Sequence, residues 1–516
     1  MSLPGVNIAL GQGGLGQAGQ SFDKYSCLIA YYKESAVVTA YNGIGDAVYN
    51  SIQDAETDGV VNTYTDATAA TSSQTVTNKG AAGDIVDIAF TSFDGTVISL
   101  CTYTVVSGDS TVILLATSLV AAINARTYLT GFSATVGSSG AFTITAPKKL
   151  GIYPNSKSVV NTITGTVAIT NNAFSGGTKS WLALWHYQIS EYFRKATAPL
   201  YFSIKFDDSA NSVSAFNTQL KSDIASVANA WEGKARRYGI LANGRTFATS
   251  TLDAVKQART TLQGLYIPAS FFIVSDNTGT ALSSLSNLSA LSDDGVFFIE
   301  GQSGSGIGYQ ISKTCIQACG SVGLALGVKS AAAISQSIAE VGAFQLSDGT
   351  ECETAVFLDG TAFDISNTSL NNQLNDYGYI FLRKFANATG TYFSNSVGAV
   401  SPASDYKYLE NVETIDKAVR GVYASILPLL NSRVTLNSDG TLSKQAIAAF
   451  QSAAGYPLTQ MAIDGDLSQD PSTNGGIVVS TTEVVSTTGK IPITIKLIPI
   501  GIARQIEITI GFVAKI

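Results

Sequence analysis

Residues 490–512 read KIPITIKLIPIGIARQIEITIGF, two runs in which apolar and polar residues alternate. A period of two predicts β-strands with one buried face. The apolar positions are Ile491, Ile493, Ile495 and Leu497 in the first run, then Ile506, Ile508, Ile510 and Phe512 in the second. An unpaired strand edge this apolar is prone to aggregate. We therefore expect the second run to pair with another strand.

A shorter extended run lies near the other end of the chain. Residues 6–10 read VNIAL, with Val6, Ile8 and Leu10 as the apolar positions, and a glycine-rich tether follows at 11–20. Strand-like arms near both ends predict a subunit that completes its neighbours' sheets by β-augmentation.

The composition indicates a protein that packs against other protein. The chain has 516 residues, of which 45% are hydrophobic and 13% charged, and the charged share is about half the usual value. The net charge is −7 without a basic block, so we expect no nucleic-acid partner. Residues 1–20 lack a signal-peptide pattern, and no stretch approaches the ~20 apolar residues of a membrane span. We expect folding in the bacterial cytoplasm and no membrane insertion.

The pattern changes between residues 62 and 178. This segment is rich in Thr, Ser, Gly and Ala, alternates over short runs, and contains one helical stretch at 110–125. We predict an inserted β-rich surface domain at 62–178. Residues 21–61 and 179–516 would form the core, with 1–20 and 490–516 as its arms.

The core alternates helical patterns with short apolar strands, which predicts helices covering a largely parallel sheet. The predicted fold class is therefore α+β or α/β and multidomain, with a mixed-sheet core, terminal strand arms and an inserted β-rich domain. Within the core we predict helices at 281–291, 312–325, 331–340 and 412–430 and a strand at 377–385.

Few residues could carry catalysis or hold a metal. The five cysteines are scattered, and His186 is the single histidine, inside an aromatic helix. This excludes a disulfide framework and argues against His-rich metal sites and Ser-His-Asp or Cys-His arrangements. Cys315 and Cys319 lie four apart and are interpreted as buried thiols. We expect no catalytic residue, metal or cofactor.

Two other segments resemble ligand sites. Residues 301–308 (GQSGSGIG) follow a strand and precede a helix, but their spacing fits neither common phosphate-binding motif. Asp207 and Asp208 end a strand without a placed partner, and we interpret them as a turn that caps the next helix. An α/β enzyme using either segment is the less favoured alternative.

Lys417 and Arg420 share one face of the helix predicted at 412–430. Two interpretations remain open from the residues. They form a solvated basic edge, or they contact an acidic partner surface.

Several stretches together resemble the tail sheath proteins of contractile phages and related injection systems, in the sheath-like branch first catalogued as a family of unknown function. The stretches are VGAFQLSDGTECETAVF (341–357), LNDYGYIFLRKFANATGTYFSN (374–395), ENVETIDKAVRGVYASILPLLNS (410–432), PLTQMAIDGDLS (457–468) and IKLIPIGIARQIEITIGFVAKI (495–516). The resemblance covers 180–516 and the first sixty residues. The segment 62–178 looks instead like a decoration module of phage tail proteins.

The resemblance implies a self-assembling subunit of a virion tail or injection particle. Such subunits stack as six-fold rings around an inner tail tube protein, join their neighbours' sheets through both arms, and contract to drive the tube through an envelope. It also implies baseplate and tail terminator partners, and Lys417 and Arg420 as candidate tube contacts. Another tail or surface structural protein is the alternative.

Overall fold

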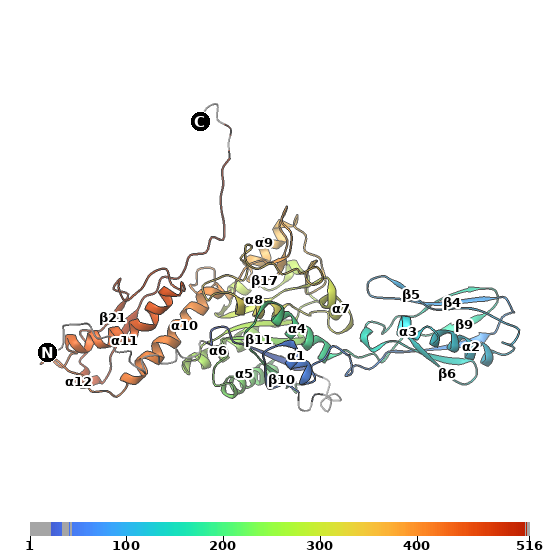
Figure 1. Ribbon diagram of the computed structural model, residues 1–516, viewed down its shortest axis with the longest axis horizontal. Coiled ribbons are helices and arrows are strands. Elements are labelled where there is room, and N and C mark those ends of the chain that lie inside the picture. The colour runs from blue at the N-terminus through green and yellow to red at the C-terminus, as the bar shows by residue number, and fades with distance from the viewer. Residues whose placement is uncertain (1–21, 34–40, 42–43, 511, 513–516) are drawn as a thin grey trace, which may run out of the picture.

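The computed structural model describes residues 22–33, 41, 44–510 and 512. The chain is elongated, with a β-rich lobe, an α/β body and a helical lobe in a row (Figure 1). With 32% helix and 23% strand in several sheets, it is a multidomain mixed α/β protein, which confirms the predicted fold class. The strand predicted around Val6, Ile8 and Leu10 lies outside the described residues.

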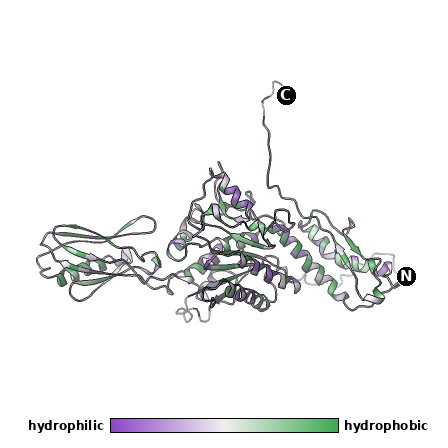
Figure 2. Ribbon diagram, turned by 180° about the vertical axis from the view of Figure 1, so that it is seen from behind, coloured by the Kyte–Doolittle hydropathy of each residue, from purple (hydrophilic) through white to green (hydrophobic). Residues whose placement is uncertain are grey.

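A seven-stranded sheet in the order β17-β14-β12-β11-β1-β10-β2 forms the centre of the body. Its strands are β1 (Ser26–Tyr32), β2 (Ala47–Tyr49), β10 (Leu200–Phe206), β11 (Arg237–Thr246), β12 (Ser270–Asp276), β14 (Val296–Ile299) and β17 (Tyr379–Ile380). Neighbouring strands are parallel except β10 and β2. These strands are strongly apolar (Figure 2), as expected for a sheet that is buried on both faces.

Helices cover both faces of this sheet. The body's helices are α1 (Ile52–Thr57), α4 (Trp181–Lys195), α5 (Val213–Ala230), α6 (Thr249–Gly264), α7 (Gly306–Thr314), α8 (Val322–Ala331) and α9 (Thr368–Asp376). Helices α4 and α8 lie on one face and α5 and α6 on the other (Figure 1). Gly323 and Gly327 let α8 approach α4, because an added Cβ would lie 1.9 Å and 2.5 Å from the carbonyl oxygens of Gln188 and Tyr192.

Short strand pairs extend the body beyond the main sheet. They are β13 (Ser292–Asp293) with β20 (Ala399–Val400), β15 (Gly301–Ser303) with β16 (Ala355–Phe357), and β18 (Leu382–Arg383) with β19 (Tyr392–Phe393). The strand predicted at 377–385 is therefore two strands, β17 and β18, which belong to different sheets.

Three predicted helices differ from the structure. Residues 281–291 form two 3-10 turns, Leu282–Ser284 and Leu288–Ala290, and the Asn287 side chain accepts from the Ser289 amide at the start of the second, a local bond that competes with a helix. The helix predicted at 312–325 is broken between α7 and α8. Residues 331–340 form turns, since the Lys329 ammonium draws three of their carbonyls around it.

Residues between Ala70 and Phe174 form a hydrophobic core of their own. The elements of this lobe are β3 (Thr71–Asn78), β4 (Ile85–Thr91), β5 (Val97–Thr104), α2 (Val112–Asn124), α3 (Thr127–Thr130), β6 (Ser133–Val136), β7 (Ala141–Thr145), a 3-10 turn (Lys148–Leu150), β8 (Val160–Thr164) and β9 (Ala168–Asn171). They make one sheet in the order β6-β7-β3-β9 and another in the order β5-β4-β8. We propose that the predicted segment 62–178 contains an inserted domain at 69–177, because Thr68 and Thr178, where the domain leaves and rejoins the body, are hydrogen-bonded to each other, whereas Tyr64 and Ala67 belong to the core of the body.

The helical lobe follows the body in the chain. Its elements are α10 (Leu409–Ile426), a 3-10 turn (Leu427–Leu429), α11 (Lys444–Ile463), β21 (Ile477–Val479), α12 (Val485–Thr488) and β22 (Ile493–Ile495). Helices α10 and α11 cross closely, where a Cβ on Gly421 would lie 2.9 Å from Pro457. Among the described helices, none combines the length and apolarity that a membrane span requires.

Helix α10 is joined to the body by buried ion pairs. The Arg237 guanidinium, fully buried at the start of β11, donates two 2.7 Å hydrogen bonds to the Glu413 carboxylate. The Lys329 ammonium lies 3.7 Å from the same carboxylate. One turn further on, Arg259 of α6 pairs with Asp416 over 2.8 Å. These pairs fix the first half of α10 against the body.

We predict that Glu413→Gln destabilises the body by about 3–5 kcal/mol, because it leaves Arg237 and Lys329 as buried cations without a carboxylate. Urea unfolding followed by tryptophan fluorescence measures this, since Trp181, Trp185 and Trp231 all lie in the body. Glu507→Gln, at an exposed carboxylate, is the matched control and should leave the midpoint unchanged.

The destabilisation caused by Glu413→Gln should depend on pH. Burial acts to raise the pKa of Glu413, but Arg237 and Lys329 outweigh it and hold the pKa below the usual 4.5. A lowered carboxylate pKa stabilises the fold above the unfolded-state value, and this contribution is lost as the pH falls towards the folded-state value. The difference in unfolding free energy between wild type and Glu413→Gln should therefore become smaller below about pH 4.5. A difference in unfolding free energy that does not change with pH would contradict a lowered pKa of Glu413.

We also predict that replacing residues 69–177 by a short glycine linker leaves the body folded. Across the junction, the Ile152 amide donates to the Thr314 carbonyl over 3.0 Å, and the Phe93 and Tyr309 rings lie 5.8 Å apart. Losing contacts of this kind should change the body's unfolding free energy by about 1 kcal/mol. Tryptophan fluorescence of the deletion variant and circular dichroism of isolated 62–178 test this. A body that fails to fold without the segment would refute the domain assignment.

Candidate assembly site

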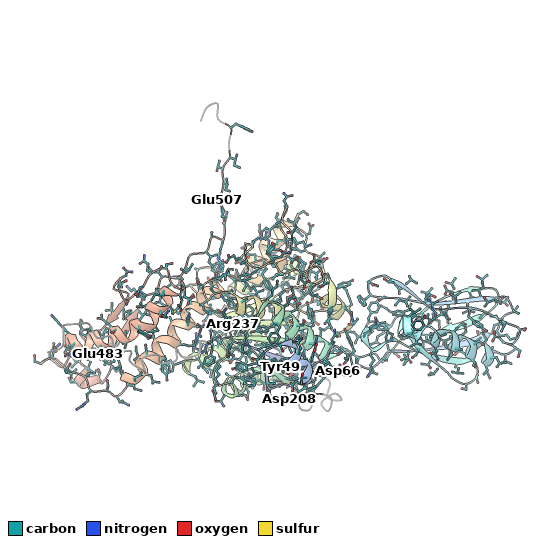
Figure 3. All side chains as sticks on the ribbon, in the orientation of Figure 1. Tyr49, Asp66, Asp208, Arg237, Glu483 and Glu507 are labelled. Carbon is teal, nitrogen blue, oxygen red and sulfur yellow. The ribbon has the colours of Figure 1, made fainter. Side chains whose placement is uncertain are left out.

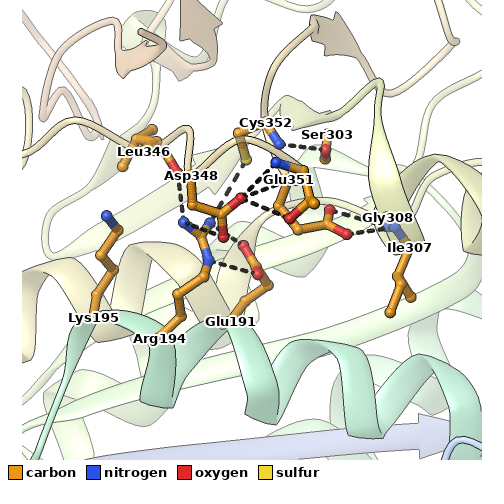
Figure 4. Close-up of polar contacts among 12 residues, drawn as sticks. Glu191, Arg194, Lys195, Ser303, Ile307, Gly308, Leu346, Asp348, Glu351 and Cys352 are labelled. Atoms are coloured by element: carbon orange, nitrogen blue, oxygen red, sulfur yellow. Dashed lines mark hydrogen bonds and ion pairs between the residues drawn. The ribbon is translucent and has the colours of Figure 1, made fainter.

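The segment 301–308, predicted as a loop between a strand and a helix, consists of β15, a turn at 304–305 and the first turn of α7, and the N-terminus of α7 already holds a carboxylate. The backbone amides of Ile307 and Gly308 donate to Glu351, the second over 3.2 Å (Figure 4). A Cβ on Gly306 would lie 2.2 Å from the same carboxylate. An anion at a helix N-terminus would need these amides. Glu351 therefore occupies the place of a phosphate.

The segment around Glu351 is held in place by its surroundings. Arg194 donates to Glu191 and to the carbonyl of Leu346, over 2.8 Å and 2.5 Å. The Cys352 amide donates to the Ser303 hydroxyl over 2.8 Å. Burial raises the pKa of Glu191 despite the opposing effect of Arg194. These contacts pack the turn against α4 and β15, so this cluster has a structural explanation.

Asp207 and Asp208 do not form an acid pair. Asp207 is buried and accepts two hydrogen bonds from the Arg245 guanidinium. It also accepts from the Ser209 amide and hydroxyl, over 3.1 Å and 2.7 Å, so it begins a turn as predicted. The predicted helix cap is wrong, because the N-cap of α5 is Ser212. Asp208 is exposed.

The remaining candidates for metal or nucleophile chemistry are dispersed. All five cysteines are buried and free, and burial raises the pKa of the Cys315 thiol to about 11. The His186 ring lies 2.9 Å from the Glu56 carboxylate, at hydrogen-bonding distance. Within the described part of the chain, no three His, Cys, Asp or Glu side chains are arranged to hold a metal ion.

The last described residues form an extended apolar segment without a partner. Residues 501–510 belong to no helix or strand, and the chain leads away from the body there (Figure 1), with Glu507 well clear of it (Figure 3). The side chains of Ile506, Ile508, Ile510 and Phe512 are 76%, 75%, 90% and 109% exposed. The strand predicted at 504–512 is absent from the single chain, because no described strand lies beside it to complete the backbone hydrogen bonds.

An apolar groove of about 950 Å³ lies in the helical lobe. One wall is the second half of α10, with Val419, Val422, Tyr423 and Ile426. The other wall is formed by Ile491, Ile493, Ile495 and Leu497. These four residues face the same way, as the alternation in the sequence predicts. Val419 and Tyr423 are 40% and 38% exposed, so the groove opens to solvent.

The groove also offers a strand edge. The first alternating run forms a strand only at β22, which pairs antiparallel with β21 through Ile477–Ile495 and Val479–Ile493. Among the described residues, β21 is the one strand that pairs with β22. A further strand could therefore add at the second edge of β22, with its alternate side chains directed into the groove. The segment 505–512 has the matching alternation.

Lys417 and Arg420 are partly buried, and both form ion pairs with carboxylates of the same chain. The Lys417 ammonium lies 2.6 Å from Asp466 and 3.1 Å from Asp23. The Arg420 guanidinium donates to the Pro268 carbonyl over 2.9 Å and lies 3.6 Å from Asp23. The interpretation of a solvated basic edge is therefore wrong. Their contact with a tube stays a prediction.

Sequence reasoning missed Arg504 and Glu410. Arg504 donates to Glu410, a carboxylate that is 2% exposed, and to Asn395 over 2.6 Å. Its guanidinium also lies 3.5 Å from the centre of the Tyr408 ring. The one available signal was an arginine at the point where the second alternating run begins. Nothing in the sequence pointed to its partner, 94 residues earlier.

Comparisons with known proteins give limited matches. Residues 405–516 match the family model described as DUF2586, C-terminal domain. No curated protein shows significant similarity to the chain. Among solved structures, a chain of the cryo-EM structure of the anti-feeding prophage baseplate, 6-fold symmetrised, has 14% identity and a TM-score of 0.40, covering 66% of this chain and 84% of that chain.

We predict that neither phosphate nor ATP with Mg²⁺ stabilises the protein, because Glu351 occupies the amides of α7. A ligand at 100 times its Kd would add about 2.7 kcal/mol, which a thermal-shift assay detects easily. Glu351→Ala exposes these amides and is the control in which a phosphate effect could appear. A dose-dependent rise in the wild-type Tm would contradict the assignment.

Proposed function

We propose that this chain is a structural subunit of a contractile tail sheath, assembled by strand exchange. The segment 505–512 of one copy adds to β22 of the next copy and directs its apolar side chains into that copy's groove. The observation that carries the proposal is the match between an exposed alternating apolar segment and an open groove lined by a second alternating run.

The energetics favour a protein partner for this segment. Fully burying an isoleucine or phenylalanine side chain contributes about 1.5–3 kcal/mol. Ile506, Ile508, Ile510 and Phe512 are all exposed in the single chain. Backbone hydrogen bonds to β22 would add to this gain, and they tolerate reorientation of the attached bodies. Repeating the exchange from copy to copy gives a closed ring or an open helical polymer, depending on whether the rotation between copies closes, because the contact is head-to-tail.

The sequence supports the sheath interpretation of that polymer. The stretches that resemble sheath proteins include both the α10 segment and the last alternating run, and the match at 405–516 spans the groove and the segment together. The low charged share suits a subunit that is packed among copies of itself. The implied partners are an inner tube protein and baseplate and terminator proteins. The arms would hold the lattice together while the bodies rotate during contraction.

We predict that the purified protein forms hollow helical tubes and that deleting 505–516 leaves a folded, non-polymerising subunit. Ile508→Asp should raise the critical concentration at least about tenfold, because it removes about 1.5 kcal/mol or more of apolar burial and places a charge in the groove. Sedimentation and negative-stain microscopy measure both effects. Glu507→Gln, on the opposite face of the same segment, is the matched control.

Different outcomes separate the parts of this proposal. Unchanged polymerisation after the deletion would refute strand exchange through this segment. Closed rings without tubes would favour another tail or baseplate component over a sheath. A monomer at every salt and protein concentration would refute self-assembly altogether.

A further inference from the structure

Of the described residues from 501 onwards, Arg504 is the one whose side chain is hydrogen-bonded to the body. Before it, Pro499 is held by a bridge to Leu467 and by the Ser468 hydroxyl, which donates to its carbonyl over 2.6 Å. After it, in 505–510, the side-chain hydrogen bond present is local, between Gln505 and Glu507. The described chain is therefore fixed at 499 and again at 504.

The attachment of Arg504 is specific to a guanidinium. Its Nη1 donates to the Asn395 side chain and its Nη2 to Glu410, while the planar group stacks on the Tyr408 ring. The second oxygen of Glu410 accepts from the Ser396 hydroxyl over 2.7 Å. A planar cation with several donors satisfies these partners together, and a lysine ammonium would not stack in the same way.

We infer that Arg504 is the positioning residue of the donor segment, directing 505–512 towards a neighbouring copy and away from the groove of its own chain. This inference rests on the proposed function. It adds a specificity element, since a segment tethered to its own groove competes at a high effective concentration with any neighbour.

The reach of the chain gives the physical reason. Arg504 lies at Glu410, in the first turn of α10, while the groove lines the second half of that 18-residue helix. Val419, where the groove begins along the second half of α10, lies nine residues beyond Glu410, a rise of about 14 Å, and a fully extended 505–512 spans about 26 Å. From Arg504 the segment would have to turn back along α10 and use about half of its length to reach the groove, so only its last few residues could enter and it could not fill its own groove. Release of Arg504 frees 500–504 as well and adds about 16 Å of reach.

Cross-linking within and between copies distinguishes the two outcomes. Ile510→Cys on the segment and Val422→Cys in the groove are combined in the full chain and treated with a short bismaleimide. The five native cysteines are buried, and the single-cysteine variants control for their reaction. With Arg504 present, we expect a ladder of covalent dimers and higher species. With Arg504→Gln, we expect the ratio of ladder to internally linked monomer to fall at least tenfold.

Charge-matched variants separate positioning from folding. Glu410→Gln with Arg504→Gln removes both charges, so no unpaired carboxylate stays buried, and the ladder should be lost to the same extent with unchanged tryptophan fluorescence. Compared with Arg504→Gln, Arg504→Lys should restore only part of the ladder of cross-linked species. An unchanged ladder in the Arg504→Gln protein would overturn the inference alone. If the parent protein gives neither ladder nor internal link, the groove assignment itself fails.

Discussion

The ion pairs of helix α10 are the constraint on which the arrangement of the chain depends. Glu413 and Asp416 join the helix to Arg237 and Arg259 at the start of the body's sheet and on α6. One helical turn away, Lys417 and Arg420 contact Asp23. Glu410, in the first turn of the same helix, holds Arg504. One amphipathic helix thus contacts the body and both segments that lead to the chain ends.

The charged and the apolar residues of α10 have different roles. Buried ion pairs contribute little net stability, but removing one partner is strongly destabilising, so they specify a geometry more than they strengthen it. The apolar residues in the second half of the helix line the groove, and Val422 and Ile426 among them also pack against the small core of the helical lobe. A helix fixed at one end and open along the other is suited to receive a strand, because its own packing does not depend on the strand being there.

Much of the fold follows from local pattern, whereas the site depends on distant contacts. The largely parallel sheet and helices such as α4 and α5 could be predicted from periodicity, and so could the common face of Ile491, Ile493, Ile495 and Leu497. The turns at 331–340 could not, since they depend on Lys329 reaching their carbonyls. Glu351 accepts from the first turn of α7, and Glu410 accepts from Arg504. In both cases the partners are far apart in the chain, and no spacing rule connects them.

The contacts of Asp23 and Arg504 on one helix have a mechanical consequence. Their partners, Glu410 and Lys417, are seven positions apart on α10, a rise of about 10 Å. Until these ion pairs break, tension between the two ends of a subunit would pass through that short length of helix. In the proposed assembly, the 62–178 lobe would lie outside the force path, so it could change in sequence without altering how one copy pulls on the next.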